Sequence, residues 1–358
     1  MACRGRVPSP PGKSSQAHGF SADLEQLPTS PPSLSPNPGM ATTLGLNHSS
    51  MSEFILVGFS TFPPHLLPIF FLLFLLMYLF TLLGNLLIMA TVWSERGLHT
   101  PMYLFLCALS ISEILYTLAI IPRLLADLLS TLHTIPFAAC ASQMFFTFMF
   151  GFTHSFLLTV MGYDRYVAIC HPLRYNVLMS PCGCTCLVAW SWVGGLVMGL
   201  VVTMAVFHLT FCGPNEVHHF FCHVPPLVKL ACGTDIPLVA LGVGLVCITS
   251  LLGCFLLIFL SYAFIVATIL KIPSAEGRHK AFSTCASHLT VVVMHYGFAS
   301  VVYLKPKAPQ SLEGDTLMGI TYTILTPFLS PIIFSLRNKE LKTAMKKTFL
   351  SKLYPQSP

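Results

Sequence analysis

Long windows without a single Asp, Glu, Lys or Arg are the feature that most constrains this chain. Seven such windows lie between positions 66 and 336, and one of them is interrupted only by Glu113. A helix rises about 1.5 Å per residue, so about 20 apolar residues cross the hydrocarbon core of a bilayer. The windows have that length and lack the short alternating pattern of a membrane barrel. The sequence predicts an all-α membrane protein, a seven-transmembrane helix bundle with spans near 66–93, 101–122, 138–163, 184–207, 236–267, 281–304 and 316–336.

The composition excludes several other classes of protein. Hydrophobic residues make up 54% of the 358 residues and charged residues 9%, whereas roughly a quarter of a soluble domain is charged. A soluble fold of this length would need more charge to cover its surface, and a nucleic-acid-binding protein would need more positive charge. The sequence therefore argues against a soluble globular protein, a disordered protein and a nucleic-acid partner.

The distribution of basic residues predicts which side of the membrane each terminus occupies. The segments after spans one, three, five and seven hold twelve basic and four acidic residues, a balance of +8. The other side holds seven basic and eight acidic residues, a balance of −1. Because Lys and Arg are enriched in cytoplasmic segments, we expect the N-terminus outside and the C-terminus inside.

The two terminal segments differ from the apolar body at 66–336. Residues 1–65 are expected to form an extracellular tail, and its first 39 residues, with eight prolines and no apolar stretch, are expected to be disordered. Met40 offers a second start, so this leader either derives from an upstream start or is an unfolded tail. Asn47 begins a glycosylation sequon in that tail. Residues 337–358 are basic, with apolar positions at helical spacing, and predict a cytoplasmic amphipathic helix attracted by anionic membrane lipid.

Several motifs occur in a fixed order within the apolar body. Met161 begins a Met-Gly-Tyr-Asp-Arg-Tyr-Val-Ala-Ile-Cys run at the inner end of span three, and Pro101-Met102-Tyr103 opens span two. Lys280 begins a Lys-Ala-Phe-Ser-Thr-Cys-Ala-Ser-His-Leu run at the start of span six, and Pro331 begins a Pro-Ile-Ile-Phe-Ser-Leu-Arg-Asn run that closes span seven. In this order the motifs resemble the olfactory receptor family, a branch of the rhodopsin-like G-protein-coupled receptors, over about residues 47–354.

The resemblance implies a function and a set of site residues. A receptor of this kind lies in the plasma membrane and binds a small volatile, mostly apolar odorant between its helices. It then activates a heterotrimeric stimulatory G protein, which raises the concentration of cyclic AMP. It is no enzyme and needs no cofactor. Asp164, Arg165 and Tyr166 are the expected G-protein-coupling residues, together with Tyr262 late in span five. Since a charge at the membrane edge is costly unless paired, Asp164 is expected to hold Arg165 at rest. Tyr262 would accept it in the active state.

Four cysteines are expected on the outer side, where disulfides persist. Cys140 begins span three, and Cys212, Cys222 and Cys232 lie in the loop after span four. Four cysteines allow three connectivities. The resemblance favours Cys140–Cys222 with Cys212–Cys232, and Cys140–Cys232 is the alternative.

Other cysteines and histidines suggest chemistry less specifically. Cys182, Cys184 and Cys186 at the inner start of span four are interpreted as packing thiols, with acylation as the alternative. The histidines around Cys222 form a solvated patch rather than a metal site, because a bridged sulfur is a poor ligand. No metal site is predicted.

Helical position indicates which residues within the bundle are buried and polar and which line the pocket. Either Glu113 pairs with His154, or His154 forms its hydrogen bonds with other groups in the core. The ligand pocket is expected in the outer halves of spans three, five, six and seven, under the outer loop. The candidates are Thr147, Phe148, Gly151, Phe152, Ser250, Tyr296, Ala299, Tyr303 and Thr323. The aromatic and hydroxyl-bearing residues among them suit apolar ligands with one polar group.

Two rival functions remain. A transporter would show internal repeats and helices broken near the middle of the membrane, but no repeat is evident and seven spans do not divide into two equal halves. A rhodopsin-like receptor for a non-odorant small molecule would share the fold but normally lacks the run that begins at Lys280. A retinal pigment would need a lysine in the seventh span, which contains none.

Overall fold

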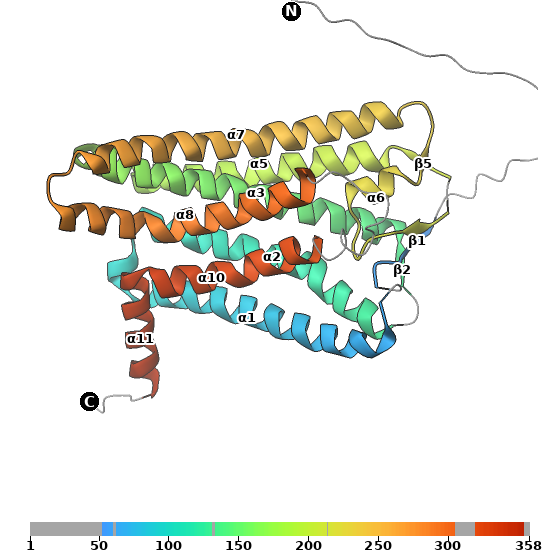
Figure 1. Ribbon diagram of the computed structural model, residues 1–358, viewed down its shortest axis with the longest axis horizontal. Helices are drawn as coiled ribbons and strands as arrows, with labels where there is room; N and C mark the ends of the chain where they lie inside the picture. Colours follow the sequence, from blue (N-terminus) through green and yellow to red (C-terminus); the bar gives the residue numbers. More distant parts are fainter. Residues whose placement is uncertain (1–51, 60–61, 131–132, 213, 305–318, 354–358) are drawn as a thin grey trace, which may run out of the picture. The chain divides into compact units, whose positions relative to one another are not determined.

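The structure is a computed structural model that describes residues 52–59, 62–130, 133–212, 214–304 and 319–353. All of them belong to one compact unit, Ser49–Pro358. Its long helices run side by side, with short strands at one end and the C-terminal helix at the other (Figure 1). The expected leader and Asn47 lie outside the described residues.

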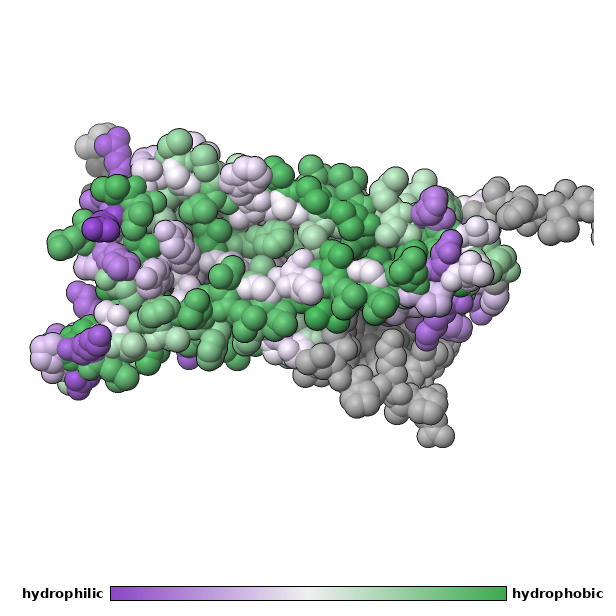
Figure 2. Space-filling model, turned by 90° about the horizontal axis from the view of Figure 1, so that it is seen from above, coloured by the Kyte–Doolittle hydropathy of each residue, from purple (hydrophilic) through white to green (hydrophobic). Residues whose placement is uncertain are grey.

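The helix bundle consists of seven helical segments. They are α1 (Leu67–Ser94), α2 (Pro101–Leu129), α3 (Phe137–Cys170), α5 (Pro181–Phe207), α7 (Ile236–Leu270), α8 (Ala275–Leu304) and the π-helical turn η4 (Thr321–Leu325) continued by α10 (Thr326–Arg337). Within the described residues, α1, α2, α3, α5 and α7 are long and apolar enough to cross a membrane. Large apolar side chains such as Leu83 (65% exposed) and Phe259 (63% exposed) lie on the outside of the bundle. Figure 2 shows hydrophobic residues over the middle of one face and hydrophilic residues toward its ends, as a bilayer requires.

Helix α3 is the centre of the bundle, because it packs against α2, α5, α7 and α8. Gly195 and Gly199 let α5 approach it closely, since a Cβ at Gly195 would lie 2.0 Å from Thr153 Oγ1 and one at Gly199 would lie 2.9 Å from the Phe145 carbonyl oxygen. The side chains facing the centre of the bundle, such as Leu157, Leu158 and Met161, are fully buried. Helix α3 therefore extends between the end of the bundle that carries the short strands and the opposite end (Figure 1).

Several helices extend beyond the charge-free windows. The second span was expected to end at Pro122, but α2 continues to Leu129. A proline removes one helical hydrogen bond without ending a well-packed helix. Leu124 and Leu128 on the following turns are buried, and Arg123 pairs with Asp127 four residues later. Helices α3 and α8 also extend into charged segments, to Cys170 and from Ala275, because charge excludes a helix from hydrocarbon but not from the membrane surface.

Short strands at one end of the bundle accompany the predicted helices. β1 (Glu53–Leu56) pairs antiparallel with β2 (Thr134–Pro136) and parallel with β4 (Glu216–Val217). β3 (Thr210–Phe211) pairs antiparallel with β5 (Ala231–Cys232). Strands this short have no readable alternation, and they form because the helices bring their segments together. The expected extracellular tail therefore contributes a strand to this cap, in which Phe54 is fully buried.

Short helices connect the longer ones, and a further helix follows the bundle. The connecting helices are η1 (Pro64–Leu66), η2 (Arg96–Leu98), η3 (Pro172–Arg174), α4 (Tyr175–Leu178) and α6 (Val224–Val228). Helix α11 (Lys339–Leu353) runs across the direction of α10 (Figure 1). Leu341 is fully buried in the same hydrophobic cluster as Met102 and Phe334. The helix in the predicted basic tail thus packs part of its apolar face on the bundle.

Candidate functional site

The Asp164–Arg165 pair lies near the end of α3 that faces α11. Asp164 is fully buried and Arg165 is 9% exposed. Arg165 Nε donates to Asp164 Oδ2 at 2.9 Å, and Nη2 pairs with the same oxygen. The hydroxyl of Tyr175, at the start of α4, donates to Asp164 Oδ1 at 2.8 Å. Both carboxylate oxygens are therefore engaged, and the aspartate holds the arginine against the bundle.

Tyr175 is the partner that sequence reasoning missed. Burial raises the pKa of its hydroxyl, and the charge of neighbouring Asp164 raises the pKa further. The phenol therefore keeps its proton at physiological pH and remains a donor. Its only sequence signal is its position in the segment that follows the Asp-Arg-Tyr motif.

Tyr262 on α7 is bonded away from Arg165. Its hydroxyl lies 2.8 Å from His288 Nδ1 on α8, and His288 Nε2 lies 2.9 Å from the carbonyl oxygen of Leu158 on α3. A carbonyl only accepts, so Nε2 carries the hydrogen and Nδ1 accepts from Tyr262. These bonds join α3, α7 and α8. The expectation that Tyr262 accepts Arg165 concerns another state; here the hydroxyl lies within hydrogen-bond distance of His288 and, at 3.4 Å, of the Cys285 carbonyl oxygen.

A buried polar cluster lies farther along α3. His154 Nδ1 is 3.7 Å from Glu113 Oε1 on α2, and its ring centroid is 4.8 Å from that of His295 on α8. His295 Nε2 lies 3.0 Å from Ser155 Oγ. The structure thus brings Glu113 and His154 together, at a distance too long for a hydrogen bond. It adds His295, which the sequence analysis left out.

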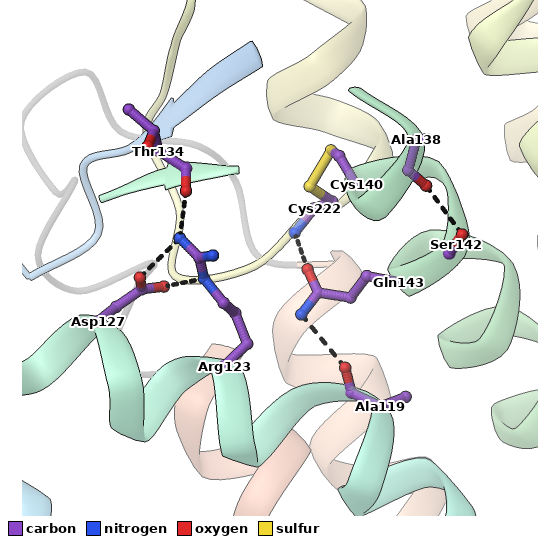
Figure 3. Close-up of a disulfide and its surroundings, with 9 residues drawn as sticks. All are labelled: Ala119, Arg123, Asp127, Thr134, Ala138, Cys140, Ser142, Gln143 and Cys222. Carbon is purple, nitrogen blue, oxygen red and sulfur yellow. Dashed lines mark hydrogen bonds and ion pairs between the residues drawn. A yellow bond between two sulfur atoms is a disulfide. The ribbon is translucent and has the colours of Figure 1, made fainter. Parts of the chain in front are cut away.

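The opposite end of α3 is tied to the loop between α5 and α7. Cys140 is bonded to Cys222, and Cys212 to Cys232, which is the pairing that the resemblance favours. Figure 3 shows Gln143 beside the first bridge: the Cys222 N–H donates to Gln143 Oε1 at 3.0 Å, and Gln143 Nε2 donates to the Ala119 carbonyl at 3.3 Å. One glutamine therefore ties the loop, α3 and α2 together.

A second tie lies beside it. Arg123 Nη2 is 2.8 Å from Asp127 Oδ1 and donates to the Thr134 carbonyl of β2 at 2.7 Å (Figure 3). The last turn of α2 is thereby fastened to the strand before α3. Together with the disulfides, these bonds fix the frame of the cap that carries the short strands.

Aromatic and histidine rings of the loop cover the bundle. The His223 ring stacks on Phe148 of α3, with centroids 6.0 Å apart. The His219 ring stacks on Phe220 at 4.4 Å, and its Nε2 would lie 3.1 Å from a Cβ at Gly319. Burial lowers the pKa of His219 to about 3, and the charge of His223 acts in the same direction. His219 and His223 are half-buried in this packed roof, whereas His218 is exposed, so the expected solvated patch describes His218 alone.

The pocket candidates lie in different environments. Five are buried between helices and one is partly buried under the roof; these are Thr147, Phe152, Tyr296, Ala299, Thr323 and Phe148. Gly151 faces α2, because a Cβ there would lie 3.7 Å from the Tyr116 ring. Ser250 donates to Met198 Sδ of α5 at 3.8 Å. Tyr303 belongs to α8, but its side chain lies outside the described part.

The described residues include no group of three or more His, Cys, Asp or Glu arranged to hold a metal ion. The site consists instead of a roofed apolar interior at one end of α3 and a hydrogen-bonded ion pair at the other. Such an arrangement can couple a change at one end of α3 to the state of the ion pair at the other end.

These features define the class of protein as a seven-helix receptor with the rhodopsin fold. Squid rhodopsin matches 83% of this chain over 89% of its own, with a TM-score of 0.63 and 16% sequence identity. The olfactory receptor family model matches residues 74–352. The chain belongs to the olfactory receptor family of G-protein-coupled receptors.

Curated relatives span almost the same length. "Olfactory receptor 10H1" of Homo sapiens is 84% identical over 310 residues, which cover 87% of this chain and 97% of that protein. "Olfactory receptor 10H28" of Mus musculus is 65% identical over 313 residues, which cover 87% of this chain and 99% of the relative. The chain is therefore a multi-pass membrane receptor and not an enzyme, with a small-molecule ligand and a G protein as its general kinds of partner.

Proposed function

We propose that this receptor binds small, mostly apolar odorants with one polar group, between the outer halves of α3, α7, α8 and the η4–α10 segment. The observation that carries the proposal is the packed roof over α3, with His223 on Phe148. Phe152 and Thr147 beneath it supply an aromatic wall and a buried hydroxyl that has no hydrogen-bond partner among the described residues. An interior of this kind suits a ligand that brings one polar group of its own.

The receptor then couples to a stimulatory G protein at the Asp164–Arg165 end and raises cyclic AMP. Ligand binding favours a state in which α8 moves away from α3, breaking the His288–Leu158 bond and freeing Tyr262. Released from Asp164, Arg165 becomes available to Tyr262 and to the G protein, and Tyr166 lies on the same segment of α3. Ligand and G protein thereby favour the same state.

The orientation follows from charge: the roof faces the outside, and the Asp164–Arg165 end and α11 face the cytoplasm of the plasma membrane. A tag at the N-terminus tests this orientation. We expect it to be stained on unpermeabilised cells, and staining that requires permeabilisation of surface-expressed receptor would reverse the assignment.

A broad odorant panel read with a cyclic-AMP reporter tests the function. We expect responses to neutral apolar compounds with one polar group, and weaker responses when Thr147→Val removes the unpartnered hydroxyl. A ligand that is strongly charged, or coupling through another class of G protein, would contradict the proposal. Ala299→Leu is the matched control for volume, since it fills space without removing a polar group.

A further inference from the structure

Three cysteines at the start of α5 have different environments. Cys184 is 1% exposed and belongs to the hydrophobic core cluster that includes Met161 and Val167. Cys182 and Cys186 are exposed. The interpretation of all three as packing thiols therefore holds for Cys184 alone. Cys182 and Cys186 are four residues apart, so they lie one turn apart on the same helix face.

That face continues along α5 as an apolar stripe. At successive steps of three or four residues from Cys186, each side chain is large, apolar and exposed: Trp190 71%, Val193 45%, Val197 50%, Leu200 47% and Met204 69%. No other described helix covers these side chains, and the stripe faces the bilayer. Cys182 and Cys186 occupy its first two turns, at the end of the bundle that holds Asp164 and Arg165.

The other described free cysteines lack this access. Cys254 and Cys285 are buried, and Cys107, Cys170 and Cys247 are only partly exposed. Residues 337–358, which include α11, contain no cysteine. Within the described part, Cys182 and Cys186 are therefore the two exposed thiols, and both lie where an attached acyl chain could enter the inner leaflet along the stripe.

We propose that Cys182 and Cys186 are S-acylated by long-chain acyl-coenzyme A. In this reaction the cysteine sulfur attacks the thioester carbonyl carbon, the carbonyl–sulfur bond to coenzyme A breaks, and coenzyme A leaves as the thiol with the proton that the cysteine gives up. No oxidant or reductant is consumed. Each acyl chain then lies against Trp190 and Val193, which anchors the start of α5 and the α4 segment that carries Tyr175.

The proposal depends on the cytoplasmic orientation of this end, because acyl-coenzyme A is cytoplasmic. The test uses the full-length tagged receptor in mammalian membranes. Free thiols are blocked, thioesters are cleaved with hydroxylamine, and the newly released thiols are coupled to a maleimide polymer of defined mass. We expect two hydroxylamine-dependent mass steps for the parent, one for Cys182→Ala or Cys186→Ala, and none for the double variant. Cys107→Ala, the matched control, keeps both steps.

Each result decides the question. Absence of steps in the parent, or their persistence in the double variant, overturns the proposal. If the double variant fails to accumulate, the same chemistry on the parent, read by mass spectrometry of the peptide that contains Cys182 and Cys186, localises the acyl groups or shows that they are absent. Staining of the N-terminal tag in the same cells separates this outcome from a reversed orientation, and neither measurement requires an odorant.

Discussion

The two ends of the bundle are held by different kinds of bond. The roofed end is closed covalently by Cys140–Cys222 and Cys212–Cys232, and short strands and the Gln143 and Arg123 bonds reinforce it. At the other end, the described residues form no disulfide. Apolar packing, such as that of Leu341, acts there together with ion pairs and hydrogen bonds, such as those of Asp164 with Arg165 and Tyr175. Disulfides persist in oxidising compartments, which agrees with the proposed orientation of the roofed end toward the outside.

The difference fits the distinct requirements of ligand binding and of coupling to a G protein. A ligand site must keep its shape while small molecules enter and leave, and covalent closure limits the conformations of its roof. A coupling site must change partners, and non-covalent bonds of about 1 to 3 kcal/mol each can be exchanged when a G protein supplies replacements. Under the proposed function, the rigid end would hold the ligand and the end with exchangeable bonds would transmit the signal.

Opening the covalent end should have the largest effect. Cys140→Ala or Cys222→Ala releases a loop of sequence separation 82, which costs about 4 to 5 kcal/mol by the loop-entropy account. We expect loss of surface receptor and of odorant response. Cys212→Ala opens a loop with a sequence separation of only 20, which costs about 3 kcal/mol by the same account. More receptor should therefore remain at the cell surface. Surface staining measures both, with Cys247→Ala as the free-thiol control; equal surface levels for all variants would contradict the comparison.

Breaking the ion pair should remove signalling without removing the receptor. Arg165→Ala removes a guanidinium that stays charged at physiological pH, and with it the contact proposed for the active complex with the G protein. We expect parental surface staining with the cyclic-AMP response reduced to background. Asp164→Asn should act oppositely and raise basal cyclic AMP, because it weakens the resting pair. If Arg165→Ala signals like the parent at equal surface level, the pair is only an anchor at the membrane edge.

Removing one hydroxyl from the coupling end should have a smaller effect. Tyr175→Phe deletes the donor to Asp164 Oδ1 and keeps the ring. A bond of about 1 kcal/mol corresponds to roughly a fivefold shift toward the active state. We expect basal cyclic AMP to rise less than with Asp164→Asn. Tyr163→Phe is the matched control, since Tyr163 is exposed on α3, and an equal rise there would rule out a specific contact.

Acidification should loosen the roof modestly. Because the pKa of His219 is lowered to about 3 in the folded loop, its neutral form is favoured there, whereas an open loop takes up a proton near pH 6.5. The stabilisation is therefore complete above about pH 6.5 and is lost as the pH falls toward 3. We expect odorant potency to fall reversibly between external pH 7.4 and 5.5, and His219→Gln to reduce that fall. The exposed neighbour His218 serves as the control position.

The smallest effect should come from an exposed ion pair beside α11. Lys347 Nζ lies 3.0 Å from Glu95 Oε2, but the lysine side chain is 71% exposed. Surface pairs of this kind contribute about 0 to 1 kcal/mol. Lys347→Ala should leave surface level and response unchanged in the same assays. A marked loss of coupling would show that α11 requires this contact.

The sequence by itself determined the features that depend on local composition. The bilayer imposes one burial rule along each span, so the absence of charge predicted the helical bundle without knowledge of its packing. The motifs around Asp164 and Lys280 were sufficient to indicate the olfactory receptor family, which the comparisons confirm. The orientation of the termini, the pocket and the coupling roles remain predictions.

Only the tertiary structure decided which side chains meet. The rotation of α5 about its axis placed Cys184 in the core and left Cys182 and Cys186 exposed, although the three residues lie within little more than one helical turn. His288 joined Tyr262 to Leu158 across three helices, and Tyr175 reached Asp164 from a separate helix. The short strands of the cap also needed partners that are distant in the chain. Local hydrophobicity places a helix in the membrane, but its rotation and neighbours depend on contacts among all the helices, and no single segment encodes them.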